Sequence, residues 1–241
     1  MNRKYLKRIA VVAIALSLVG GVALAPASLA AGPSRYITMS SEGTVKVAPD
    51  AVRLTATVTN LADTNANALA ATAKVSAAVR AALVANGIST KDIATQNITA
   101  YPEYNYTPEK AILTGYRASQ TFVVVIRKAK TAGAVVDAVV TAGGDAIQVT
   151  GVSPFVLDST KSVDAARTAA VKNTKAKASK YAALVGVKLG KVMYVVENSA
   201  PQVYVGQPMA MAAKADSTTP TQVDLGQQDV TVSITIQWAL L

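Results

Sequence analysis

Alternating apolar and polar residues mark several segments of the chain, and this period of two predicts β-strands. The clearest alternation lies near the C-terminus, in DVTVSITIQW, where every second residue from Val230 to Trp238 is apolar. The segment TFVVVIR is apolar on both faces, which predicts an inner strand of a sheet. Residues 35–47 also alternate weakly, and Gly43 interrupts them, so we expect a short pair of strands there. Further strand patterns cover residues 52–59, 92–100, 113–127, 147–157 and 189–197.

Three other segments repeat apolar residues every three or four positions, which predicts helices. The first follows the capping residues Asp63-Thr64-Asn65 and ends at Asn86-Gly87, and the second covers residues 130–142 before Gly143-Gly144. The longest begins at Asp158-Ser159-Thr160 and runs to about Val185, and the small alanines on its inner face would let it lie close to a sheet. Its expected inner face consists of Val163, Ala166, Ala170, Thr174, Ala178, Tyr181 and Val185.

The order of these elements repeats along the chain. Residues 52–100 and 147–196 each contain a strand, a long alanine-rich helix, a glycine turn and a second strand, and each leads through a proline-bearing loop to a further strand. This repetition predicts a duplicated β-α-β-β unit, with sub-units at about 36–128 and 129–241. Many strands with only three helices indicate an α+β fold, with the helices on one face of a mostly antiparallel sheet. Residues 200–226 predict a long irregular connection.

The first thirty residues have the three-part pattern of a secretory signal peptide. Four basic residues precede an apolar stretch, and Ser28-Leu29-Ala30 places small residues where a signal peptidase would cut, after Ala30. An uncleaved anchor is the alternative, but Gly20, Gly21 and Pro26 interrupt the apolar stretch before the roughly 20 residues that a spanning helix needs. We therefore expect residues 31–241 to be a secreted or periplasmic domain that has no spanning helix after cleavage.

The composition removes many kinds of site. The chain has no cysteine and no histidine, so disulfides, Ser-His-Asp or Cys-His catalysis and His- or Cys-based zinc sites are excluded. No phosphate-binding glycine motif occurs, and we expect no cofactor, no metal site and no catalytic residues. A Ser-Lys pair at Lys161-Ser162 and a carboxylate pair at Glu103 and Glu109 stay formally open, but solvated surface residues explain both better, and the sequence favours a protein that is not an enzyme.

Tyrosine gathers in one stretch, YPEYNYTPEKAILTGY, which holds four of the nine tyrosines. The stretch joins two predicted strands, so it predicts a hairpin, and its prolines would remove backbone donors from an edge. By the period of two, Tyr116 shares a face with Phe122 in the following strand and is expected in the core. Tyr101, Tyr104 and Tyr106 are then the exposed candidates for contact with another protein, because tyrosine buries a large area while keeping a hydroxyl group available.

Basic residues gather on the longest helix, where Lys172, Lys175, Lys177 and Lys180 form a run near its C-terminal end that would complement the helix dipole. The chain carries +10 in all, and removal of the expected signal peptide leaves 20 basic and 14 acidic side chains, or +6. A solvated helix face is the simpler explanation of the run. The alternative is a module that binds an anionic envelope component through these lysines, and nucleic acid is not an expected partner.

Five blocks of the sequence, in their order and spacing, resemble the SIMPL-domain family, whose bacterial members are secreted, are often periplasmic and include immunogenic envelope proteins. The resemblance implies an α+β fold with a long hairpin, and for some members ring-like homo-oligomers. It implies no catalytic residues, and the family's link to oxidative-stress defence would have to be indirect in a chain without cysteine or histidine. We therefore expect a non-enzymatic envelope protein that self-associates through strand edges and the tyrosine hairpin. The blocks are DIATQNITAYPEYNY, LTGYRASQTFVVVIRK, GAVVDAVVTAGGDAIQVTGVSPFVLD, KASKYAALVGVKLGKVMYVVE and the closing strand after STTPTQVDLG.

Overall fold

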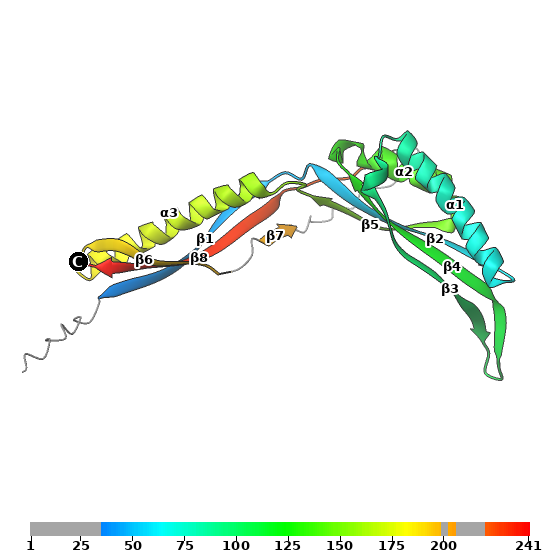
Figure 1. Cartoon of the computed structure of the whole chain (residues 1–241), viewed down its shortest axis with the longest axis horizontal. Coiled ribbons are helices and arrows are strands. Elements are labelled where there is room, and N and C mark those ends of the chain that lie inside the picture. Colours follow the sequence, from blue (N-terminus) through cyan, green and yellow to red (C-terminus); the bar gives the residue numbers. More distant parts are fainter. Residues whose placement is uncertain (1–34, 199–201, 206–219) are drawn as a thin grey trace, which may run out of the picture. The chain divides into compact units, whose positions relative to one another are not determined.

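The computed structural model describes residues 35–198, 202–205 and 220–241. The predicted signal peptide and its cleavage site lie outside these residues. The described part contains three α-helices and two antiparallel sheets, which confirms the predicted α+β class (Figure 1).

One sheet consists of β3 (Ile93–Tyr106), β4 (Ala111–Ile126), β2 (Ala51–Ala62) and β5 (Ile147–Phe155), in that order across the sheet. All three pairings are antiparallel, and β4 is an inner strand, as TFVVVIR predicted. Two helices, α1 (Asn65–Ala85) and α2 (Ala132–Gly143), pack on this sheet. The largest side chains that they bury with it are Phe122, Leu54, Leu83 and Ile126.

The ends of α1 follow the sequence signals. Thr64 caps its first turn, where the Thr64 hydroxyl accepts a hydrogen bond from the backbone N–H of Asn67. At the other end, Gly87 adopts a positive φ of 79°, the conformation that glycine tolerates best after a helix. By length and composition α1 could cross a membrane, since its best 18-residue window has a mean hydropathy of 1.5. It carries Lys74 and Arg80, however, and its buried side packs on β2 and β4, as in a helix that covers one face of a sheet.

The other sheet consists of β1 (Tyr36–Val47), β8 (Gln228–Leu240) and β6 (Leu189–Glu197), with β8 in the middle. The short strand β7 (Gln202–Val205) also pairs with β8, so the connection predicted as irregular contains a strand. The helix α3 (Thr160–Leu184) packs on β1 and β8 (Figure 1). The core beneath it contains the apolar face of β8, namely Val230, Val232, Ile234, Ile236 and Trp238.

The strand β1 is continuous, so the predicted short strand pair within residues 35–47 was wrong. Its residues pair with β8 without interruption, from Tyr36 opposite Ala239 to Val47 opposite Gln228. Gly43 is buried, and a Cβ atom added to it would overlap the backbone of α3 at Ala166 and Ala170. The glycine is therefore explained by close helix packing, and not by a break in the strand.

The buried face of α3 differs from the prediction at its C-terminal end. Its first five predicted members are buried, but Ala182 takes the next position, while Tyr181 and Val185 are 48% and 65% exposed. The buried residues from Ala166 to Ala182 recur every four positions, so the buried stripe drifts around the helix and continues through Ala182 instead of Tyr181. Val185 is the residue that follows the last helical turn, so the helical period no longer positions its side chain.

The predicted repetition of elements is present, but one strand has changed places. The sheet order β3-β4-β2 with α1 matches the order β6-β8-β1 with α3, so each long helix accompanies three equivalent strands. In the second set, β1 takes the place that a simple duplication would give to β5. The strand β5 instead pairs with β2 in the first sheet. The two sheets therefore do not follow a division of the sequence at residue 128.

The packing of α3 on β1 predicts that Gly43→Ala destabilises the fold. The added methyl group meets the backbone of α3, which cannot rotate away, so we expect a loss of about 1–3 kcal/mol in the free energy of unfolding. Urea unfolding measures this loss. Gly151→Ala in β5 is the matched control, because its nearest atom is Thr55 Cβ at 3.9 Å. Equal unfolding free energies for the two variants would show that α3 does not rest on Gly43.

Candidate functional site

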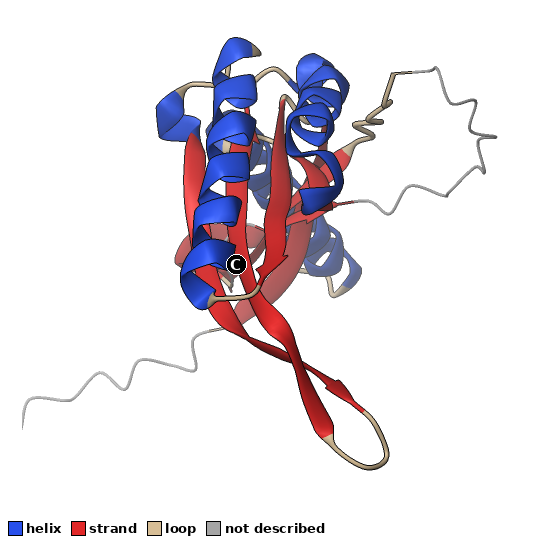
Figure 2. Ribbon diagram, turned by 90° about the vertical axis from the view of Figure 1, so that its right-hand side faces the viewer, coloured by secondary structure: helices blue, strands red, loops and turns tan. Residues whose placement is uncertain are grey.

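The β3–β4 hairpin extends past the N-terminal end of α1 (Figure 2). A register shift lies between Glu103 and Tyr104, and beyond it Tyr104 pairs with Leu113 and Tyr106 with Ala111. Every residue from Tyr104 to Thr114 is exposed. The predicted hairpin is therefore present, and its tip is a free two-stranded ribbon with apolar residues on it.

The three candidate tyrosines do not form one cluster. Tyr104 and Tyr106 lie on the same face of β3, with ring centroids 6.3 Å apart and planes tilted by 45°. Their exposed fractions are 43% and 78%, and Leu113 lies beside them, paired with Tyr104. Tyr101 is an odd number of residues away from both, so it lies on the opposite face of the strand. The hairpin thus presents a pair of tyrosines on one side and a single tyrosine on the other.

The base of this hairpin is fixed by an ion pair between Glu103 and Arg117. Arg117 Nη2 donates to Glu103 Oε1 at 2.6 Å, and Arg117 Nε also donates to the second carboxylate oxygen. The hydrogen bond from Arg117 lowers the pKa of Glu103, against the opposing effect of desolvation. Glu103 is therefore held as a carboxylate, which makes it a poor general acid.

Tyr116 is half-buried, so it is less buried than the predicted core position implies. It lies on the same face of β4 as Phe122, which is 2% exposed. Tyr116 pairs with Ala62, the last residue of β2, and α1 begins only at Asn65. The helix α1 does not extend over this end of the sheet, so alternation along β4 alone does not bury the ring of Tyr116.

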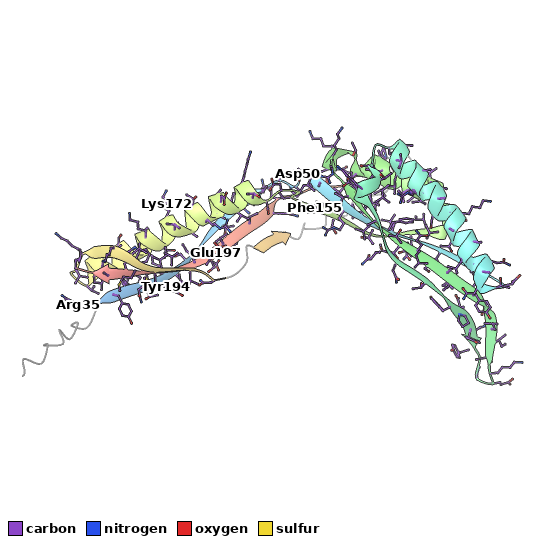
Figure 3. The ribbon with its side chains drawn as sticks, viewed as in Figure 1. Arg35, Asp50, Phe155, Lys172, Tyr194 and Glu197 are labelled. Carbon is purple, nitrogen blue, oxygen red and sulfur yellow. The ribbon has the colours of Figure 1, made fainter. Side chains whose placement is uncertain are left out.

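The four lysines of the predicted basic run point in different directions around α3. Lys175 and Lys177 are two residues apart, so they project from roughly opposite sides of the helix and flank its buried stripe. Lys177 Nζ donates to the backbone oxygen of Ser40 in β1 at 3.3 Å. Lys172 lies on the outer side of the helix, away from the strands (Figure 3), and Lys180 is also exposed. The structure therefore does not join the four into one basic patch.

The expected effect of these lysines on the helix dipole was also wrong. The last turn of α3 contains no basic residue, because the helix continues to Leu184 beyond Lys180. Dipole interactions fall off within one turn of the helix end. Lys161 and Ser162, the formal Ser-Lys pair, are adjacent residues at the start of the same helix, where neighbours do not face each other.

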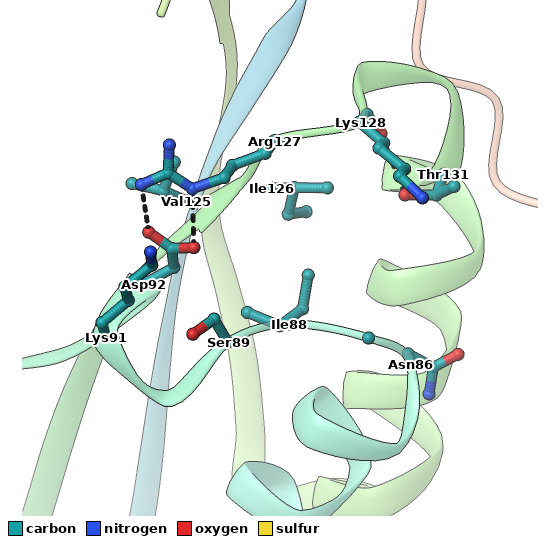
Figure 4. Close-up of a pocket in the computed structure, with 11 residues that line it drawn as sticks. Asn86, Ile88, Ser89, Lys91, Asp92, Val125, Ile126, Arg127, Lys128 and Thr131 are labelled. Carbon is teal, nitrogen blue, oxygen red and sulfur yellow. Dashed lines mark hydrogen bonds and ion pairs between the residues drawn. The ribbon is translucent and has the colours of Figure 1, made fainter.

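A pocket of about 470 Å³ lies where the turn after α1 meets the end of β4 (Figure 4). Asp92 and Arg127 form a bidentate ion pair in its wall. Arg127 Nε donates to Asp92 Oδ2 at 2.8 Å, and Arg127 Nη2 donates to Asp92 Oδ1 at 2.7 Å. The carboxylate side is buried, since the Asp92 side chain is only 7% exposed, whereas that of Arg127 is 49% exposed. Lys91 and Lys128 also line the pocket. No sequence pattern indicates this pair, because 35 residues separate its members and only the pairing of β3 with β4 brings them together.

The chemistry of this pocket is that of a structural ion pair. The hydrogen bond from Arg127 lowers the pKa of Asp92, against the opposing effect of burial, and the same bond raises the pKa of Arg127. Both groups are thereby held in their charged forms, so neither is suited to proton transfer near neutral pH. In the described part of the chain, no three acidic side chains lie close enough to hold a metal ion.

The ion pair predicts an acid-dependent loss of stability. Because the pKa of Asp92 is lowered by folding, its contribution is complete above its ordinary value of 3.8 and is lost as the pH falls below that value through the folded-state pKa. Arg127→Gln should therefore unfold at lower urea than the wild-type protein at pH 6, and the difference should shrink toward zero in strong acid. The control Lys130→Gln removes a nearby exposed charge. A difference for Arg127→Gln that does not change with pH would contradict this account.

Comparison with known proteins places the chain in a family. Residues 37–238 match the profile of the SIMPL family, described as "Protein of unknown function (DUF541)". The chain is 34% identical over 211 residues to "Uncharacterized protein YggE" of Escherichia coli K12, covering 84% of this chain and 80% of that one. It is 29% identical over 218 residues to the "26 kDa periplasmic immunogenic protein" of Brucella melitensis, covering 85% of each. The profile match runs from the second residue of β1 to Trp238 in β8, and the chain belongs to the SIMPL family.

Proposed function

We propose that this protein is a non-enzymatic, extracytoplasmic protein of the bacterial cell envelope that assembles into a homo-oligomer. A location outside the cytoplasm is supported by the signal-peptide pattern of residues 1–30 and by the relative that is named periplasmic. A role in contact, and not in catalysis, is supported by the absence of cysteine and histidine and by the ion pairing of Asp92 and Glu103.

The observation that carries the proposal is the exposed apolar surface of the hairpin tip. Tyr104, Tyr106 and Leu113 share one side, and Tyr101 and Ile112 lie on the other, with exposed fractions of 43–78%. Monomeric proteins rarely leave such a group uncovered, and tyrosine is enriched in interfaces. Glu103 and Arg117 at the hairpin base neutralise each other, so this pair adds no net charge to the surface that would meet a second copy.

The edges of the sheets offer a second element of assembly. The strand β3 is an edge strand, so its outer backbone groups face no neighbour in the described part of the chain. Pro102 removes one donor from this row, which limits uncontrolled pairing but leaves the hairpin side chains available. Assembly would therefore rest mainly on side-chain contacts of the tyrosines.

A link to oxidative-stress defence is part of the proposal only in an indirect form. The chain has no thiol or imidazole group, so it cannot itself carry out the usual thiol or histidine–metal redox chemistry. An assembled envelope protein would act on stress resistance by maintaining the envelope. The alternative function, an anionic-component module using Lys172, Lys175, Lys177 and Lys180 together, is not favoured, because these side chains do not share a face.

The proposal predicts that Tyr104→Ser/Tyr106→Ser weakens self-association. Each tyrosine at the centre of an interface contributes more than about 1 kcal/mol, so the double variant should raise the dissociation constant at least about thirtyfold. Light scattering or sedimentation over a range of protein concentrations measures the mass. Tyr181→Ser, a change of an exposed tyrosine on α3, is the matched control and should leave the mass unchanged.

Two results would reject the proposal. One is a wild-type protein that stays monomeric at tens of micromolar. The other is an assembly that the hairpin variant and the Tyr181→Ser control weaken equally.

A further inference from the structure

A groove of about 480 Å³ lies between α3 and β6, on the sheet formed by β1, β8 and β6. Val171 and Lys175 line it from the helix, Lys191 and Val192 line it from β6, and Ile236 and Trp238 line it from β8. Its volume lies within the range of about 300–1,000 Å³ that is usual for small-molecule sites. All of its walls come from one helix and one sheet.

The groove exists because α3 does not cover β6. The helix packs on β1 and β8, where Gly43 and the alanines allow close approach, and it contacts β6 only weakly. The pairing of β6 with β8 is irregular, with register shifts on both sides of Val192. Apolar side chains on the two walls are consequently left open, with Val171 46% and Val192 52% exposed, above the buried ring of Trp238.

The charges at the groove have one sign. Lys175 and Lys191 line it from opposite walls, and no aspartate or glutamate is among its lining residues. The acidic residue of β6, Glu197, is bonded to Arg167 at 2.9 Å and lies outside the groove. Among the described residues, neither lysine takes part in an ion pair. A groove that is lined by two lysines and by apolar side chains is complementary to a ligand that has an apolar tail and an anionic head.

We propose that this groove binds one molecule of a single-chain anionic amphiphile, an acyl chain that ends in a carboxylate. The tail would lie along Val171 and Val192 over Ile236 and Trp238, and the carboxylate would lie between Lys175 and Lys191. A bilayer surface fits less well, because Trp238 is only 3% exposed at the bottom of a concave site. A second copy that docked through the same strand would bring its own Lys191 toward these two lysines.

The ligand can be followed through Trp238, because it is the only tryptophan in the chain. Octanoate, decanoate and dodecanoate, each below its micelle concentration, should change the Trp238 emission in a saturable way. Affinity should rise about tenfold for each two methylene groups, as expected for burial of an acyl chain. Dodecyltrimethylammonium, with the same tail and the opposite charge, should bind at least about tenfold more weakly than dodecanoate.

Charge reversal tests the site itself. Lys175→Glu/Lys191→Glu should weaken dodecanoate binding at least about tenfold, while Lys172→Glu/Lys180→Glu, an equal charge change on the outer side of α3, should not. Both variants must first show the ligand-free Trp238 emission and urea midpoint of the wild-type protein. If Lys175→Glu/Lys191→Glu does not, Lys175→Gln/Lys191→Gln replaces it, with the same expected direction.

The proposal is overturned if both charge variants weaken binding equally, if affinity does not depend on chain length, or if the cationic amphiphile binds as well as dodecanoate. It is also overturned if emission changes only with anionic phospholipid vesicles, or if it follows protein dilution instead of added amphiphile. The groove does not depend on the proposed assembly, since the hairpin variant Tyr104→Ser/Tyr106→Ser should bind dodecanoate as the wild-type protein does.

Discussion

The contact between Gly43 of β1 and the backbone of α3 determines how the second sheet is covered. A glycine on the strand and alanines on the helix bring the two backbones close together, and any larger side chain at residue 43 would overlap Ala166 and Ala170. A helix held this close over β1 and β8 cannot also cover the next strand, β6, because one helix with its side chains is only about 10–12 Å wide. The exposed face of β6 and the groove beside it are consequences of this packing.

The same contact bears on the exchanged strand. Because β1 pairs with β8 along its whole length, the place beside β8 that a simple duplication would give to β5 is already filled. The strand β5 then pairs with β2, whose free side would otherwise be a sheet edge. Each sheet therefore contains strands from distant parts of the sequence. Such pairings tie the two halves of the chain into one folding unit, since neither sheet can be completed by one half alone.

Most elements of this fold could be predicted from the sequence, because period-two and period-3.6 patterns are local, but the short strand β7 and the continuity of β1 could not. The pairing partners could not be predicted either. Gly43 fits both a broken strand and a close helix approach, and only the presence of α3 above it decides between them. The Asp92–Arg127 pair joins residues 35 positions apart, and no local pattern links them.

The composition of the sequence identifies the candidate contact residues, but it does not show which way their side chains point. Tyr101 is close in sequence to Tyr104 and Tyr106, but alternation along β3 places it on the opposite face of the strand. Counting lysines grouped four side chains that the helical period distributes around α3, and Lys191, which shares the groove with Lys175, lies on another element. The groove itself depends on the irregular pairing of β6, for which the sequence carries no clear signal.

The proposed assembly and the proposed ligand binding are both non-covalent, and the hairpin tip and the groove suit different partners. The hairpin tip projects from its sheet (Figure 2), and the ion pair at its base adds no net charge, so it suits the proposed contact with a second copy. Its tyrosines keep their hydroxyl groups in water when the tip is free, which lowers the cost of exposure. The groove is concave and positively charged, so it excludes a flat protein surface but admits a narrow anionic molecule. Because the two surfaces lie on different sheets and share no residue, mutations that test the proposed assembly should leave the proposed ligand binding unchanged, and the reverse.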